Sequence, residues 1–278
     1  MTNPGEGSEA GPIGIFDSGV GGLSVAREIR AALPAEDILY VADTAYCPYG
    51  DRPLEEVRAR ALAVGRYIQE SGAKLLVAAC NTASGAALED LRGALSIPVV
   101  GLEPAVKTAV AQTRVGRVGV MATSGTLRSE RFARLLRAHG DGIQVIAQAC
   151  PGLADLIEEG HLDGDVLGAA LQELTRPLRD AAVDMVVLGC THYAFVGGPM
   201  QRVLGTAVTL VAAAHKLLFS DDIACSVSPL LSMSGPEHIP TDATACPFNI
   251  CLRRFRWDVV TTDSRTHLAP SAQPRLLR

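Results

Sequence analysis

Two cysteines at the ends of apolar runs are the first residues in this sequence that could do chemistry. Cys80 ends the run in "LLVAACNTAS" (75–84), and Cys190 ends the run in "MVVLGCTHYA" (185–194), 110 positions later. A single buried cysteine is commonly a small apolar core residue. Two thiols that each stand beside small polar groups could instead form a disulfide, bind a metal ion, or act as an opposed acid and base.

The spacing of these residues favours the acid–base interpretation. Redox pairs usually lie close together in the sequence, and a metal site would want more ligands than the Cys-x-His at 190–192 and one distant cysteine supply. Opposed acid–base chemistry needs one proton carrier on each face of a substrate carbon, and two facing half-sites provide that geometry. We therefore expect no metal ion in this site.

Three further titratable residues stand where they could assist the thiols. Asp17 in "FDSGVGG" follows a predicted strand, so it either caps the next helix or supports a neighbouring thiol. His192, two residues from Cys190, is either a hydrogen-bonded core histidine or a group that modulates the thiol and shuttles a proton. Glu158 in "CPGLADLIEEG" could simply be a solvated carboxylate at a helix end.

Other local motifs have simpler interpretations. The glycines that follow Asp17 match neither GxGxxG nor GxxxxGK[ST], although they could form a backbone nest for a substrate carboxylate. Tyr49 and Gly50 in "CPYGDRP" are typical of a turn. We interpret Cys47 and Cys150 as packing residues.

The elements that must position these residues follow from the hydrophobic pattern. Short apolar runs that end in Gly, Ser, Thr, Asp or Cys predict strands at 13–19, 38–45, 74–82, 97–104, 117–125, 143–150, 185–192 and 207–214. Amphipathic stretches between them predict helices, for example at 24–33, 54–71, 126–140 and 165–178. This alternation indicates α/β architecture, with mainly parallel sheets covered on both faces. Ligands of such sheets bind at the carboxyl ends of the strands, where both cysteines lie.

A weak internal repeat predicts two similar halves. "IGIFDSG" at 13 resembles "VGVMATSG" at 118, and the run before Cys80 resembles the run before Cys190, with offsets of 105 and 110 residues. These offsets are too long for a solenoid repeat. They suit two similar three-layer α/β domains that face each other across a central cleft.

The predicted division assigns 1–102 plus 206–278 to the first domain and 103–205 to the second, with crossings near "VGLEP" and Gly205. The first twelve residues are polar and rich in Gly and Pro, which indicates a frayed tail. Residues 220–278 are atypical, because no helical period is sustained there beyond about ten residues. One hypothesis is that a shifted reading frame produced this segment.

The composition excludes several classes of protein. The chain has 278 residues, of which 48% are apolar and 20% charged, and its formal net charge is −5. No basic field invites nucleic acid, and no apolar stretch approaches the roughly 18–20 residues that a membrane helix needs. Seven cysteines with no CxxC pair argue against a disulfide framework and favour the reducing cytoplasm.

Six motifs, in order and at familiar separations, cover residues 13 to about 204 and resemble those of the glutamate racemases, which are cofactor-independent amino-acid racemases. The motifs are "GIFDSGVGGLSV", "ADTAYCPYGDRP", "AACNTAS", "VVGLEPAVK", "ACPGLADLIEEG" and "VLGCTHYAF". The resemblance implies a two-domain α/β enzyme, usually a homodimer, that interconverts L- and D-glutamate without a cofactor. It also implies that the D-isomer feeds peptidoglycan synthesis.

The resemblance further assigns roles to individual residues. Cys80 and Cys190 would be the two bases, one on each face of the substrate Cα. Asp17 would assist the Cys80 side, and His192 with Glu158 the Cys190 side. The substrate would be held by Asp17, Ser18, Tyr49, Gly50, Asn81, Thr82, Cys190, Thr191 and His192.

Three alternatives stay open at this point. The nearest is an aspartate or hydantoin racemase of the same superfamily, which differs in the size of its substrate. A hydrolase could use Cys80 as the nucleophile and His192 as the base, although this leaves Cys190 unexplained. A non-catalytic amino-acid-binding protein on the same fold is the third, because the atypical C-terminal segment departs from the family pattern.

Overall fold

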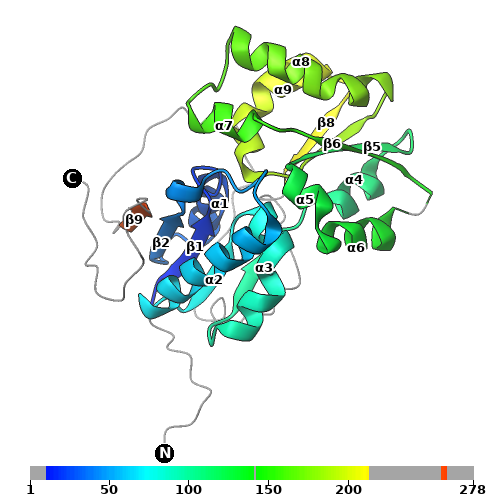
Figure 1. The fold of residues 1–278 in the computed structure, drawn as a ribbon. Coiled ribbons are helices and arrows are strands. Elements are labelled where there is room, and N and C mark those ends of the chain that lie inside the picture. Colours follow the sequence, from blue (N-terminus) through cyan, green and yellow to red (C-terminus); the bar gives the residue numbers. More distant parts are fainter. Residues whose placement is uncertain (1–10, 141, 213–257, 262–278) are drawn as a thin grey trace, which may run out of the picture.

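The computed structural model describes residues 11–140, 142–212 and 258–261, which form two α/β domains, each built on a parallel sheet (Figure 1). The first domain contains β1 (Ile13–Asp17), α1 (Leu23–Ala32), β2 (Ile38–Ala42), the short 3-10 helix η1 (Thr44–Tyr46), α2 (Leu54–Glu70), β3 (Leu75–Ala78), α3 (Asn81–Ala94), β4 (Val99–Gly101) and β9 (Asp258–Thr261). The second contains α4 (Val106–Gln112), β5 (Arg117–Ala122), α5 (Ser124–Arg128), α6 (Glu130–His139), β6 (Gln144–Ala149), α7 (Leu153–Glu158), α8 (Asp165–Asp180), β7 (Met185–Leu188), the 3-10 helix η2 (Thr191–Val196), α9 (Gly197–Leu204) and β8 (Thr209–Ala212).

The two sheets repeat one strand order. The first sheet has the order β4-β3-β1-β2-β9, and the second has the order β6-β5-β7-β8. Reading the second sheet in reverse aligns β8, β7, β5 and β6 with β4, β3, β1 and β2. The resembling segments therefore occupy equivalent strands, β1 with β5 and β3 with β7. The α/β prediction with parallel sheets in two domains is confirmed.

The first domain has three layers because successive side chains of each buried strand point to opposite faces. Phe16, Leu76 and Val41 pack with α2 and α3, whereas Ile15 and Tyr40 pack with α1. Every residue of β1, β2 and β3 is buried, so both faces of the sheet are covered. These strands read as continuous apolar runs for that reason.

The second domain repeats these layers. Met121, Val186 and Leu188 pack with α7, α8 and α9, on one face of the sheet. Val120 and Val187 pack with α4 and α6 on the other face. Figure 1 shows α8 and α9 together on the outer side of this domain, and α4 and α6 on its opposite side.

One predicted helix is divided in two. The segment predicted as a helix at 126–140 contains the end of α5 and all of α6, and Ser129 separates them. Ser129 has an extended backbone, with φ −71° and ψ 141°, and its Oγ accepts a hydrogen bond from the Phe132 amide at 3.1 Å. The side-chain cap therefore starts a new helix where periodicity alone predicts continuation.

The boundary of the second domain differs from the predicted crossing at Gly205. Strand β8 lies beyond that glycine and pairs in parallel with β7, so the second sheet continues to Ala212. Strand β9 pairs in parallel with β2 at the edge of the first sheet. The predicted N-terminal tail up to residue 10, and most of the atypical segment with its reading-frame hypothesis, lie outside the described residues.

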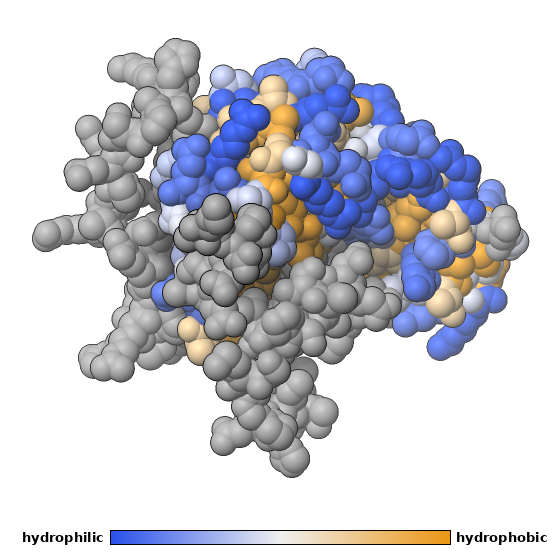
Figure 2. Space-filling view, turned by 90° about the horizontal axis from the view of Figure 1, so that it is seen from below, coloured by the Kyte–Doolittle hydropathy of each residue, from blue (hydrophilic) through white to orange (hydrophobic). Residues whose placement is uncertain are grey.

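Hydrophilic residues form much of the coloured surface in Figure 2, and apolar residues are visible between them. The large apolar side chains that the described surface exposes include Val20, Leu23 and Phe195. None of the helices in the described ranges combines the length and apolar composition that a membrane span requires. The predicted homodimer stays a prediction.

Candidate active site

The carboxyl ends of the two sheets face each other across the domain boundary. Asp17 is the last residue of β1, and Cys80 and Cys190 follow β3 and β7 closely. The Thr191 hydroxyl donates a hydrogen bond to Oδ2 of Asp17 at 3.1 Å, although 174 residues separate the two. The structure therefore brings the residues predicted at both strand ends into one site.

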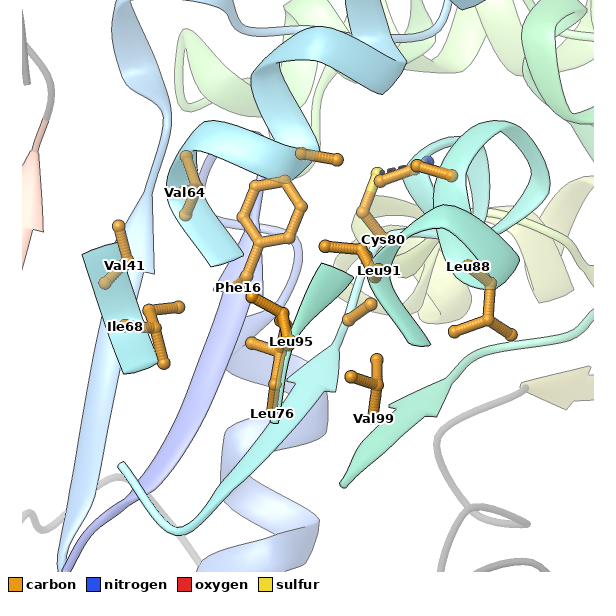
Figure 3. Packing of buried hydrophobic residues seen from close by; sticks show 14 of the residues in the cluster. Phe16, Val41, Val64, Ile68, Leu76, Cys80, Leu88, Leu91, Leu95 and Val99 are labelled. Carbon is orange, nitrogen blue, oxygen red and sulfur yellow. Dashed lines mark hydrogen bonds between the residues drawn. The ribbon is translucent and has the colours of Figure 1, made fainter. Parts of the chain in front are cut away.

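Cys80 lies at the edge of the first core. Figure 3 shows its side chain beside the ring of Phe16 and above Leu91 and Leu76, within the same apolar cluster. The thiol also caps α3, because its Sγ accepts a hydrogen bond from the Ala83 amide at 3.4 Å. Burial is the main reason that the pKa of Cys80 is raised, and the nearby carboxylate of Asp17 raises it further. The Ala83 amide opposes this increase, as expected for a thiolate at a helix N-terminus.

Asp17 is fully buried and heavily hydrogen-bonded. The amide of Gly19 donates to its Oδ1 at 2.9 Å, and the Ser18 hydroxyl is 3.4 Å from the same atom. Burial raises the pKa of Asp17 to about 6, although the nearby His192 and the hydrogen bonds from Gly19 and Thr191 oppose the increase. A carboxyl group with this pKa can exchange a proton near neutral pH.

His192 connects Cys190 to Glu158. Its Nδ1 lies 3.6 Å from Sγ of Cys190, and its Nε2 lies 2.5 Å from Oε1 of Glu158. Burial alone lowers the pKa of His192, but hydrogen bonds to Cys190, Cys47 and Glu158 raise it overall. The pKa of Glu158 is lowered because bonds from His192 and from the Val20 amide outweigh its partial burial. The arrangement stabilises an imidazolium beside the Cys190 thiol.

Asn81 and Thr82 begin α3 directly after Cys80. The side-chain amide of Asn81 is buried and has no hydrogen-bond partner among the described residues, so both of its polar atoms are free to bind another group. The Thr82 hydroxyl is 2.8 Å from the Thr123 hydroxyl and 3.3 Å from that of Thr126, in the second domain. Asn81 therefore offers binding groups, whereas the Thr82 side chain joins the domains.

Tyr49 and Gly50 lie nearby, but their visible contacts are structural. The Tyr49 hydroxyl donates to Oδ2 of the buried Asp43 at 2.5 Å, and Arg60 pairs with both oxygens of that carboxylate at 2.7 and 2.9 Å. The Gly50 carbonyl accepts a hydrogen bond from the Gly125 amide of the second domain at 2.8 Å. No pattern in the sequence predicts the interaction between Asp43 and Arg60.

The glycines after Asp17 allow the second domain to approach closely. A Cβ on Gly19 would collide with Oε1 of Glu158, and one on Gly21 would collide with the His192 ring. The amide of Val20, in the same loop, donates to Oε1 of Glu158 at 2.8 Å. These glycines are thus required by contacts between the domains.

The interpretation of Cys47 as a packing residue is wrong. Its side chain is half-buried, and its Sγ donates to Oε1 of Glu158 at 3.3 Å. The ligand atoms of Cys47, Glu158 and His192 all lie within 4.8 Å of one another. Sequence reasoning missed this contact because 111 residues separate Cys47 from Glu158. Cys150, by contrast, is buried in the core of the second domain, as predicted.

The sequence that forms this fold matches a known class of proteins. The family model described as Asp/Glu/Hydantoin racemase matches residues 13–217. The chain belongs to this family.

Two similar relatives within this family are both named glutamate racemase. The chain is 54% identical to a glutamate racemase from Pseudomonas paraeruginosa over 205 residues, which is 73% of this chain and 77% of the relative. It is 41% identical over 261 residues to one from Cupriavidus pinatubonensis, which is 94% of this chain and 90% of that one. The predicted resemblance to glutamate racemases is confirmed.

Solved structures of glutamate racemases are also similar to this chain. Escherichia coli glutamate racemase, solved with L-glutamate and the activator UDP-MurNAc-ala, matches with a TM-score of 0.71 and 34% identity, covering 84% of this chain and 87% of that one. The Thermus thermophilus glutamate racemase matches with a TM-score of 0.71 and 36% identity, covering 92% and 90%. The prediction of an amino-acid racemase is thus confirmed at the level of the family.

Proposed function

We propose that this protein interconverts L- and D-glutamate by two-base catalysis, with Cys80 and Cys190 on opposite faces of the substrate Cα and without a cofactor. The observation that carries the proposal is the equivalence of the two thiols. Each follows the corresponding strand of one domain, β3 or β7, and each has its own acid–base neighbour. Relatives that are named glutamate racemases support glutamate as the substrate.

In one direction of the reaction, the thiolate of Cys80 takes the Cα proton and the thiol of Cys190 returns a proton to the opposite face. The reverse direction exchanges the two roles. Burial and Asp17 keep the Cys80 thiol protonated before substrate binds. The substrate ammonium group would lower the pKa of Cys80, and Asp17, with its pKa of about 6, would accept the thiol proton.

On the other face, His192 holds the proton balance of Cys190. Nδ1 of His192 faces Sγ of Cys190, where it can pass a proton to the sulfur, and Glu158 at Nε2 stabilises the positive charge of the ring. Cys190 can then donate its proton to Cα and regain one from His192. The two half-sites therefore use different groups for the same task, a carboxyl beside Cys80 and an imidazolium beside Cys190.

The carbanion that forms at Cα needs fixed hydrogen-bond donors. The amides of Asn81 and Thr82 lie in the first turn of α3, where helix N–H groups lack intrahelical partners and attract anions. We assign the α-carboxylate to this helix end, together with the Asn81 side chain and Thr191. Ser18 and the backbone of Tyr49 and Gly50 complete the proposed substrate contacts. Asp17, Cys190 and His192 line the same space.

The wider role follows from this assignment. D-glutamate produced by the reaction would supply peptidoglycan synthesis in the cytoplasm, and the enzyme would act as a homodimer. Aspartate is the nearest alternative substrate, because the family model covers aspartate racemases as well. A panel of L-amino acids would discriminate between them.

The decisive experiment incubates the purified full-length chain with L- or D-glutamate in D₂O, without added pyridoxal phosphate. NMR follows deuteration at Cα while optical rotation follows racemisation. We expect both isomers to exchange Cα hydrogen and lose rotation. A folded protein that binds glutamate without exchange would contradict the proposal and favour the amino-acid-binding alternative.

A further inference from the structure

We propose that Cys47, Glu158 and His192 form a binding site for a thiophilic divalent cation such as Zn²⁺, which joins the two domains and blocks the active site. Cys47 precedes the "PYG" turn of the first domain, whereas Glu158 ends α7 and His192 lies in η2 of the second domain. Each contributes a different ligand type, namely a thiolate, a carboxylate and an imidazole. Structural and catalytic zinc sites draw on these three groups.

The distances suit a metal ion after a small adjustment. Sγ of Cys47 is 3.3 Å from Oε1 of Glu158, and Nε2 of His192 is 2.5 Å from the same oxygen. Tetrahedral zinc with ordinary bond lengths separates sulfur and oxygen ligands by about 3.6 Å and nitrogen and oxygen ligands by about 3.3 Å. The sulfur is thus already near its required separation, and the His192–Glu158 pair must open by roughly 0.8 Å.

The orientation of His192 separates this site from the proposed catalytic thiol. Nδ1 faces Cys190 and Nε2 faces Glu158, so a cation bound at Nε2 lies on the side of the ring away from Cys190. Binding would release the Cys47 thiol proton and replace the proton between His192 and Glu158. The thiolate selects Zn²⁺ or Cd²⁺ over the hard cation Mg²⁺.

The site also accounts for contacts that the proposed reaction does not use. Cys47 contacts Glu158 from across the domain boundary, and a Cβ on Gly19 would collide with both side chains. The three ligands therefore converge over the Gly19 loop, where the domains meet. A cation held there would restrain domain opening and displace the proton between His192 and Glu158, on which the proposed supply of protons to Cys190 depends.

The binding test uses Cd²⁺ and the ultraviolet absorption of its bond to thiolate. It is run on the full-length chain and on a full-length background in which the cysteines outside the described residues, Cys225, Cys246 and Cys251, are replaced by serine. In that background we expect one bound Cd²⁺ with a thiolate band. Cys47→Ser and Cys47→Ala should each remove the band, and Cys150→Ala, the matched control, should retain it.

Two results would overturn the assignment. One is a band of full intensity in the folded Cys47 variants, and the other is a band that Cys190→Ser removes while Cys47→Ser keeps it. Excess Mg²⁺ should not displace Cd²⁺, and its displacement would count against a thiolate site.

The inhibitory consequence rests on the proposed function and is measured separately. Racemisation is compared with and without Zn²⁺, relative to the basal rate of each variant. We expect Cys47→Ser to raise the inhibitory Zn²⁺ concentration by at least about tenfold, because even the loss of an outer partner of a metal ligand typically costs that much. Cd²⁺ binding in a chain that does not racemise glutamate would support the site and contradict the proposed function. Unchanged Zn²⁺ inhibition in Cys47→Ser would show that inhibition arises elsewhere.

Discussion

Thr191 donates a hydrogen bond to the buried carboxylate of Asp17 at 3.1 Å, across the boundary between the two domains. Asp17 ends the central strand of the first sheet, and Thr191 begins the short helix after β7 of the second. Asp17 is the proposed helper of Cys80, and Thr191 stands between Cys190 and its proposed helper His192, so the bond couples the relative position of the domains to the protonation of the site. The bond thus links the Cys80 half-site, through Asp17, to the Cys190 half-site, through Thr191.

The buried Asp17 should make stability depend on pH. Its pKa is raised from 3.8 to about 6, chiefly by burial. The folded state therefore binds more protons than the unfolded state between these values, and the stability present below pH 4 is lost as the pH rises through 6. Asp17→Asn should increase the free energy of unfolding at pH 8 by on the order of 2–3 kcal/mol, at roughly 1.4 kcal/mol per pKa unit.

Urea unfolding at pH 4 and pH 8 measures this effect. The advantage of Asp17→Asn should disappear toward pH 4, where the wild-type carboxyl is protonated in both states. Asp37→Asn, at an exposed position, is the matched control and should change stability equally little at both pH values. A gain of the same size at pH 4 and pH 8 would contradict the assignment.

The two thiols should be separable by their exchange chemistry. Cys80→Ser and Cys190→Ser should each lower racemisation by at least about 10²–10⁴-fold, the usual contribution of a general acid or base. Each variant retains one thiol, so the two should catalyse residual Cα deuteration of opposite isomers of glutamate in D₂O. Cys150→Ala should keep wild-type turnover. Full racemisation by either serine variant would eliminate the two-base mechanism.

The Gly19 loop should tolerate no side chain. A Cβ at this position collides with Glu158 and crowds Cys47, so Gly19→Ala should push the second domain away from the site. We expect kcat/KM for glutamate to fall by about 10²-fold, because small displacements of positioned catalytic groups have effects of that size. Gly93→Ala on the exposed side of α3 meets no atom within 4 Å and should leave kcat/KM unchanged. Wild-type kcat/KM in Gly19→Ala would show that this contact does not matter.

The Tyr49 hydroxyl should matter more for stability than for substrate binding. Tyr49→Phe removes a hydrogen bond to the buried Asp43 and should cost about 1.5–3 kcal/mol of unfolding free energy. The KM for glutamate should change by less than about twofold, because the hydroxyl is hydrogen-bonded to Asp43 and we expect it to contribute no binding energy toward the substrate. A tenfold increase in KM would assign the hydroxyl to the substrate instead.

Replacing Arg60, which also binds Asp43, should lower the free energy of unfolding by more than Tyr49→Phe does. Arg60→Met removes the guanidinium that pairs with the buried Asp43 carboxylate and should cost about 3–5 kcal/mol in urea unfolding. Arg27→Met is the matched control, because Arg27 is 77% exposed and pairs only with its neighbour Glu28 among the described residues. Its loss should change stability by less than about 0.5 kcal/mol. Equal effects of the two substitutions would show that Asp43 does not depend on Arg60.

Much of the fold could be predicted from short segments. Buried parallel strands need long apolar runs, and the turns after them need small polar residues, so the strand ends that carry Cys80 and Cys190 are visible in the sequence. The division of the predicted helix at 126–140 was missed because the Ser129 cap competes with a periodicity that continues past it. The crossing near Gly205 was misjudged because an apolar run does not reveal which sheet it joins.

The sequence by itself determined the family, the α/β architecture and the paired thiols, because motifs and strand patterns are local. Only the tertiary structure decided which side chains meet across the domain boundary. Cys47 reaches Glu158, Thr191 reaches Asp17, and the Gly19 loop accepts the second domain through contacts between residues more than 100 positions apart. Such contacts depend on how two finished domains pack, and no local pattern of residue types encodes that packing.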